Sequence, residues 1–181
     1  RFQVGGAHCD EGQVWVPIAG ESEQAGSIIL ALDTSTLAPA IRFEVRDYIA
    51  AVAHLDGSVF GVNDDSTIMY QWDVEGREQR RVALATGARY QDMETANGSL
   101  VCAGVSPQGG VLDILDPESL SLLTRHMCSA RARNGQLVTS RGFAYRESIF
   151  FFMPAAGDWP HLVSYALQGT TLPDYIPRAQ R

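Results

Sequence analysis

The stretch EGQVWVPIAG at residues 11–20, followed after a polar break by GSIILALDTSTL at residues 26–37, sets the pattern of the whole chain. Both parts are rich in apolar and β-branched residues and are bounded by Gly, Glu and Asp. Short runs of this kind are typical of β-strands. The stretch therefore predicts a strand, a turn and a second strand, and the same arrangement returns three more times along the chain.

The four copies align on the small residue that opens the first strand of each hairpin. These residues are Gly12, Gly57, Gly98 and Ser148, and the intervals between them are 45, 41 and 50 residues. A second strand follows the first in every copy. The second strands are predicted at Ser27–Asp33, Thr67–Val74, Gly110–Asp116 and His161–Leu167.

A period of roughly 40 to 50 residues with four short strands per unit is typical of a β-propeller. We therefore predict an all-β, β-propeller-like fold of four repeat units with about four antiparallel strands each. The ring is either a small closed propeller or part of a larger one, because no outer strand is evident after Leu167. The strands nearest the axis are predicted at Val4–Cys9, Ile49–His54, Tyr90–Thr95 and Ser140–Tyr145.

Length and composition limit the classes of function. The 181 residues suffice for one compact domain, predicted at residues 1–169 and followed by a tail at residues 170–181. A net charge of −7 argues against nucleic-acid binding. No stretch approaches the roughly 20 consecutive apolar residues of a membrane helix. All 14 basic residues are arginines, which excludes Schiff-base and P-loop chemistry that depends on lysine.

The three cysteines, Cys9, Cys102 and Cys128, are widely spaced. No Cys-x-x-Cys pair is present, so a cysteine zinc cluster is not expected. Cys102 lies in an apolar strand and is predicted to be a buried thiol. A disulfide between Cys9 and Cys128 is compatible with the sequence, which does not decide its redox state.

Six runs of the sequence also resemble a known family. They resemble the later portion of DUF6454, a family of uncharacterised bacterial propeller-like proteins, over roughly residues 3–167. The resemblance implies a propeller-like fold, additional amino-terminal sequence in other members, and export to the periplasm or beyond. It implies no activity. The runs are GGAHCDEGQVWVPIA, RDYIAAVAHLDGSVFGV, MYQWDVEG, YQDMETANGSLVCAGV, GGVLDILDP and SIFFFMP.

The chain departs from the family pattern at two places. The pattern has His-Pro before the first Gly-Gly pair, where this chain has Gln3-Val4. It often has Asp-His where this chain has Asp47-Tyr48. If those histidines serve a site in other members, the site is altered here.

Polar side chains on or just before the inner strands are candidates for a site at the mouth of the central channel. His8 and Glu94 occupy the same repeat position in units one and three, so in a small ring they would face each other across the axis. Trp159 lies in a loop and is a candidate for stacking on a sugar or a partner. The channel candidates are His8, Asp47, Tyr48, His54, Gln91, Asp92, Glu94 and Arg141.

Three of these residues, His8, Asp92 and Glu94, are predicted as metal ligands or as an acid/base pair. Histidine and carboxylates serve both purposes, and calcium or zinc would suit them. The structural alternative is that these groups satisfy backbone donors at the ends of crowded strands, while Arg141 neutralises the carboxylates. The sequence leaves both alternatives open.

The usual catalytic motifs, GxSxG, HExxH, GxGxxG and GxxxxGK[ST], are absent. We therefore expect a non-enzymatic module, without a cofactor, that binds a small molecule, a glycan or a protein. The alternative is a lactonase-type or esterase-type hydrolase with a divalent metal at the channel mouth. In a third arrangement a partner chain, or a second copy in a homo-oligomer, completes the ring.

Overall fold

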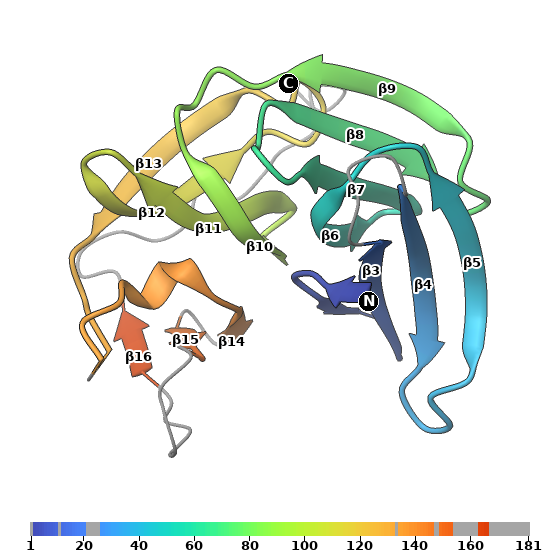
Figure 1. Ribbon diagram of the computed structural model, residues 1–181, viewed down its shortest axis with the longest axis horizontal. Helices are drawn as coiled ribbons and strands as arrows, with labels where there is room; N and C mark the ends of the chain where they lie inside the picture. The colour runs from blue at the N-terminus through green and yellow to red at the C-terminus, as the bar shows by residue number, and fades with distance from the viewer. Residues whose placement is uncertain are drawn as a thin grey trace.

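The computed structural model describes residues 2–10, 12–20, 26–132, 134–146, 149–153 and 163–166. These residues form four antiparallel sheets around a common axis, and each sheet is one repeat unit (Figure 1). The prediction of an all-β, propeller-like fold of four units is confirmed. No helix among the described residues has the length and apolar character needed to cross a membrane.

Unit 1 holds five strands instead of the expected four. The sequence predicts one continuous inner strand, but the structure divides it into β1 and β2, which both pair with β3. The remaining strands follow outward from the axis as predicted. The strands are β1 (Phe2–Val4), β2 (His8–Asp10), β3 (Gln13–Gly20), β4 (Ser27–Asp33) and β5 (Pro39–Val45).

Units 2 and 3 each hold four strands, with the first strand innermost and the last outermost. The strands with predicted bounds, β6, β8, β10 and β12, begin and end within one residue of the prediction. Unit 2 contains β6 (Ile49–Leu55), β7 (Ser58–Asn63), β8 (Ile68–Asp73) and β9 (Glu78–Ala83). Unit 3 contains β10 (Arg89–Ala96), β11 (Ser99–Ser106), β12 (Gly109–Leu115) and β13 (Leu122–Cys128).

Unit 4 has three described strands, β14 (Phe143–Arg146), β15 (Ile149–Phe152) and β16 (Val163–Ala166). The predicted inner strand Ser140–Tyr145 is wrong at its start. Residues 138–140 form a 3-10 helix, η1 (Val138–Ser140), in which the Ser140 hydroxyl donates to the Leu137 carbonyl at 2.6 Å. The predicted domain boundary at residue 169 lies outside the described residues.

Two glycines explain why the predicted inner strand Val4–Cys9 is interrupted. The Gly5 amide still donates to its own sheet, at the Pro17 carbonyl, but the Gly6 amide donates to the Ala50 carbonyl of unit 2 at 2.8 Å. The chain thus changes partners between these residues. A β-carbon at Gly6 would overlap the Asp92 carboxylate and backbone of unit 3, so only glycine permits this approach.

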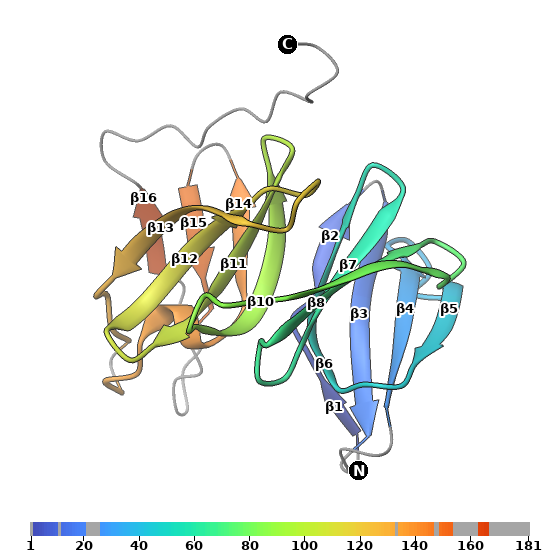
Figure 2. The same cartoon turned by 90° about the horizontal axis from the view of Figure 1, so that it is seen from above.

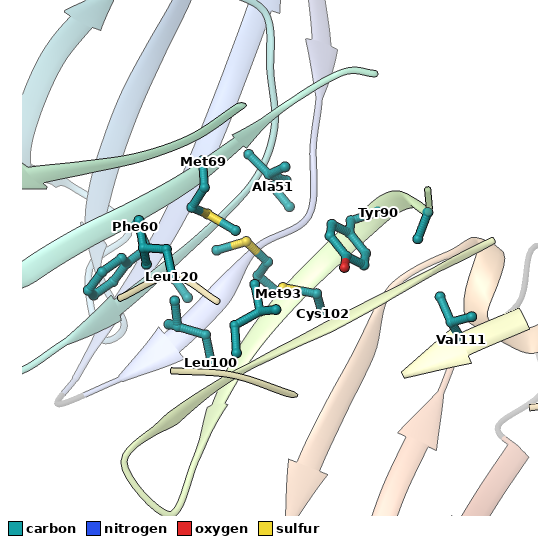
Figure 3. Close-up of a cluster of buried hydrophobic side chains, with 13 residues drawn as sticks. Ala51, Phe60, Met69, Tyr90, Met93, Leu100, Cys102, Val111 and Leu120 are labelled. Atoms are coloured by element: carbon teal, nitrogen blue, oxygen red, sulfur yellow. The ribbon is translucent and has the colours of Figure 1, made fainter. Parts of the chain in front are cut away.

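The hydrophobic core consists of three clusters, one between each pair of neighbouring units. Figure 3 shows the cluster between units 2 and 3, where Phe60 and Met69 meet Met93 and Leu100. These four side chains are 0 to 2% exposed. Units therefore stack in the order 1, 2, 3 and 4, and among the described residues no strand pair or core cluster joins unit 4 to unit 1 (Figures 1 and 2).

The three cysteines are free thiols, so no disulfide links Cys9 to Cys128. Cys9 is exposed, whereas Cys102 and Cys128 are buried. Burial raises the pKa of the Cys102 thiol well above its usual value, which keeps it protonated and apolar in character.

The substitution Gly6→Ala tests the close approach at the axis. We expect it to lower the free energy of unfolding by about 3 kcal/mol or more, because the methyl group would press against backbone atoms. Gly142→Ala is the matched control, since a β-carbon there meets atoms only at 3.4 Å and beyond and the change should cost less than about 1 kcal/mol. Urea denaturation measures both, and equal effects would contradict the proposed packing.

Candidate functional site

The beginnings of the four inner strands gather at one mouth of the central channel, where they enclose a pocket of about 480 Å³. Every unit contributes to its wall. A concave site with a few convergent polar groups is the usual form of a small-molecule site. The lining residues are Gln3, Val4, Gly5, Gly6, Ala7, Tyr48, Ala50, Asp64, Arg89, Gln91, Asp92, Arg141, Gly142 and Met153.

Four of the residues selected from the sequence line this pocket: Tyr48, Gln91, Asp92 and Arg141. Tyr48 is half-buried, and its hydroxyl donates to the side-chain oxygen of Gln3. Burial, assisted by a nearby carboxylate, raises the pKa of Tyr48 above its usual value. The hydroxyl therefore stays protonated at neutral pH and can serve as a donor or acceptor.

Two pocket residues, Asp64 and Arg89, are not among the channel candidates chosen from the sequence. The guanidinium Nη2 of Arg89 lies 2.6 Å and 2.8 Å from the two carboxylate oxygens of Asp64, and its Nε donates to the Asp64 carbonyl. This pair joins unit 2 to unit 3 at the rim of the pocket. The one feature of the sequence that could have indicated this pair is the position of Arg89 at the start of an inner strand.

Arg141 is the cation of the pocket that has no acidic partner among the described residues. It is exposed and precedes β14. The expected neutralisation of Asp92 or Glu94 by Arg141 does not appear as an ion pair in the described part of the chain. Its guanidinium, which carries five N–H donors, is therefore free to bind a ligand.

Asp92 lies at the axis and connects three units. It is 2% exposed, and its carboxylate accepts hydrogen bonds from the backbone amides of Met93, at 3.0 Å, and Phe143 of unit 4, at 2.8 Å. Burial raises the pKa of Asp92 well above its usual value, and the charge of Glu94 adds to the effect, while the two amides oppose it. This geometry supports the structural alternative for Asp92.

His8 and Glu94 meet across the axis. The Nδ1 atom of His8 lies 2.6 Å from a carboxylate oxygen of Glu94, and their side chains are 3% and 12% exposed. The other ring nitrogen of His8, Nε2, is buried and has no hydrogen-bond partner within the described structure. The pair connects unit 1 directly to unit 3.

His54 forms a similar pair one unit away. Its Nδ1 atom lies 2.9 Å from a carboxylate oxygen of Asp10, which connects units 2 and 1. The Trp15 ring stacks on the imidazole, with ring centroids 4.9 Å apart and an interplanar angle of 13°. This stacking orients His54 against the core between the two units.

The three predicted metal ligands are not arranged as one set of ligands. His8 and Glu94 bind each other, whereas Asp92 is held by backbone amides. Across the described ranges, no group of three His, Cys, Asp or Glu side chains is placed to hold a metal ion.

Another candidate, Asp47, lies away from the main pocket. Asp47 accepts a hydrogen bond from the Tyr70 hydroxyl at 2.7 Å and lines a smaller cavity of about 230 Å³ between units 1 and 2. The Tyr70 ring stacks on Trp72, and the Arg81 guanidinium lies over it. Trp159 falls outside the described residues.

A family of unknown function, DUF6454, matches residues 1–107. The chain belongs to the DUF6454 family. The resemblance seen in the sequence is thus confirmed over residues 1–107, and the family description assigns no activity. No curated protein matches this DUF6454 chain.

Solved structures confirm the fold of this DUF6454 member. Glutaminyl cyclase from Myxococcus xanthus has a TM-score of 0.61 and 12% identity, covering 82% of this chain and 60% of the cyclase. A luciferin-regenerating enzyme has a TM-score of 0.61 and 10% identity, covering 93% and 62%. The Pan2 WD40 domain of Neurospora crassa has a TM-score of 0.52 and 10% identity, covering 88% and 60%.

These identities show similarity of fold alone. In each comparison the DUF6454 chain spans less than two thirds of the length of the neighbour.

The pH dependence of stability tests the burial of Asp92. Because its folded-state pKa is raised, the unfolded carboxyl ionises first as the pH rises above about 4. Wild type should therefore lose stability relative to Asp92→Asn between pH 4 and 7, as measured by urea denaturation at several pH values.

Asp33→Asn is the control, because the stability contributed by Asp33 should change with pH in the opposite direction. Hydrogen bonds from Ser35 and Thr36 lower the pKa of Asp33 to about 2, so this carboxylate stabilises the fold above pH 4 and loses that effect as the pH falls towards 2. A stability difference between wild type and Asp92→Asn that does not change with pH would show that Asp92 is not desolvated.

Proposed function

We propose that this chain is a non-enzymatic binding module whose channel-mouth pocket takes a small polar molecule with a carboxylate group. The observation that carries the proposal is the exposed guanidinium of Arg141, which lines the pocket without an acidic partner among the described residues. The volume of about 480 Å³ suits a ligand of the size of a sugar acid.

The charges of the other pocket residues favour an acidic ligand. Arg89 and Asp64 neutralise each other at the rim. Asp92 is 2% exposed and its carboxylate accepts hydrogen bonds from two backbone amides, so it presents little free acceptor to the pocket. Arg141 therefore dominates the field, and guanidinium binds carboxylates through two parallel hydrogen bonds.

The remaining pocket groups can recognise hydroxyls. Tyr48 and Gln91 are half-buried polar side chains on the wall, and Gln3 is exposed at the edge. Their donors and acceptors match the hydroxyls of a sugar or hydroxy acid. A sugar acid satisfies both the cation and these neutral groups.

The proposal predicts that glucuronate raises the melting temperature of the protein and that glucose, which lacks the carboxylate, does not. Arg141→Gln should weaken glucuronate binding about 10-fold or more, since a hydrogen bond to a charged group contributes about 1.5–3 kcal/mol. Thermal shift and calorimetric titration provide the measurements.

Arg146→Gln is the matched control, because Arg146 is also exposed and also belongs to unit 4 but does not line the pocket. Citrate and succinate extend the panel to other small carboxylates. Absence of binding by all three acids, or equal losses in the two arginine variants, would overturn the proposal.

A metal-dependent hydrolase of the lactonase or esterase type is the second candidate. The observation in its favour is His8, whose Nδ1 binds a carboxylate while its buried Nε2 has no partner in the described chain. Metal-binding histidines commonly contact a carboxylate in this way. The fold is compatible with enzymes, since the cyclase and the luciferin-regenerating enzyme share it.

Elemental analysis of the dialysed protein separates the two candidates. The binding module should contain no stoichiometric divalent metal. One equivalent of zinc or calcium that is lost in His8→Ala and Glu94→Ala but retained in His54→Ala would favour the hydrolase instead.

A further inference from the structure

The direction of the Arg141 side chain depends on the backbone that carries it, because its guanidinium has no acidic partner among the described residues. On one side lies η1, whose Val138 and Thr139 are fully buried. On the other side β14 begins with Phe143, which is 1% exposed and belongs to the core cluster between units 3 and 4. Only Arg141 and Gly142 lie between these two anchored elements.

The Asp92 carboxylate contacts this short segment. Its Oδ2 atom accepts the hydrogen bond from the Phe143 amide at 2.8 Å, two residues after Arg141. A β-carbon added to Gly142 would lie 3.4 Å from the same oxygen, so the carboxylate borders that residue as well. The Gly142 carbonyl in turn accepts a hydrogen bond from the Met153 amide at 2.9 Å. Both residues that follow Arg141 are thus held by hydrogen bonds of their backbone.

Asp92 is itself held in place by units 3 and 1. Its second oxygen, Oδ1, accepts a hydrogen bond from the Met93 amide at 3.0 Å. Gly6 of unit 1 lies against the same oxygen, since a β-carbon at this glycine would be 2.3 Å from it. The carboxylate therefore has a fixed orientation in which each oxygen serves one amide.

We propose that Asp92 is a positioning residue of the channel-mouth pocket and that it directs Arg141 towards the carboxylate of a bound ligand through the Phe143 amide. This inference rests on the proposed function of the pocket. Asp92 acts indirectly, because both of its oxygens are engaged with backbone amides. Loss of the bond at Phe143 would let the segment shift, and the two parallel hydrogen bonds of a guanidinium to a carboxylate tolerate only small changes in geometry.

The substitution Asp92→Asn separates this role from an effect of charge. Asparagine has the same shape but only one acceptor oxygen, so its NH₂ group would face one of the two amides. Met93 follows directly in the same strand, so the oxygen can keep that bond and the bond to Phe143 is lost. If Asp92 acted only through its negative charge, removing the charge would strengthen the binding of an acidic ligand. The positioning role predicts the opposite, weaker binding.

Calorimetric titration with glucuronate measures this sign. Asp92→Asn should weaken binding about 5-fold or more, and so should Asp92→Ala, which removes both acceptor oxygens. In the Arg141→Gln background the same two changes should alter the affinity less than about 2-fold, because no guanidinium is left to be misplaced.

Asp113→Asn is the matched control. Asp113 is also a fully buried carboxylate of unit 3, but it binds Tyr90 and Arg125 and does not line the pocket. Its substitution should destabilise the fold and leave the affinity for glucuronate unchanged, so it reports the effect of lost stability alone.

Hydrogen exchange of the ligand-free protein tests the contact independently of binding. The Phe143 amide should exchange at least about 10-fold faster in Asp92→Ala than in wild type, measured relative to the amides of β7 in unit 2. Asp113→Asn should leave the relative rate at Phe143 unchanged.

The two measurements distinguish this inference from the proposed function. If wild type binds none of the three acids of the panel, the proposed function fails and the ligand-binding role of Asp92 fails with it. If wild type binds glucuronate, the positioning role alone is overturned by any of three results. These are tighter or unchanged binding in both Asp92 variants, losses that are as large in Asp113→Asn or in the Arg141→Gln background, and unchanged exchange at Phe143 in Asp92→Ala.

Discussion

The Asp92 carboxylate is the contact on which the arrangement of the units depends. It belongs to unit 3, accepts a hydrogen bond from the Phe143 amide of unit 4 and lies against Gly6 of unit 1. A buried carboxylate is costly unless hydrogen bonds compensate for its lost hydration. Two backbone amides offset part of this cost, and the one from Phe143 ties the inner strand of unit 3 to that of unit 4.

This axial contact also divides the candidate residues by role. His8 and Glu94, close to the axis, bind each other across units and do not line the pocket. Groups at the start of the inner strands, such as Tyr48 and Arg141, border open volume. Whether a polar side chain joins two units or borders the pocket therefore depends on its position along the inner strand.

The repeat was visible in the sequence because each strand needs a short apolar run and each hairpin needs residues that tolerate a tight turn. The second strand of unit 1, Ser27–Asp33, was placed without error for this reason. The break at Gly5 and Gly6 was not predictable, because its cause is a carbonyl of unit 2 and a carboxylate of unit 3. The pattern of residues within a short segment carries no information about contacts with residues so far away in the chain.

The candidate site likewise contains some features that the sequence predicts and others that depend on contacts between distant segments. Position within the repeat predicts position around the axis, which is why Tyr48 and Arg141 were found and why His8 was placed opposite Glu94. The pairing of Arg89 with Asp64 depends on how units 2 and 3 pack, and no spacing rule contains that information. For Asp92 the sequence offers the binding of backbone donors as one of two alternatives, and the amides of Met93 and Phe143 favour it only once the units are packed.

The interrupted inner strand of unit 1 has a consequence for the order of folding. Its segment is synthesised before units 2 and 3, yet the bond between His8 and Glu94 spans 86 residues of chain. This strand therefore has to wait until unit 3 has been synthesised before it reaches its final contacts. Loop closure over such a separation slows folding, but it also ties the first unit to the third, so that neither can open without disturbing the other.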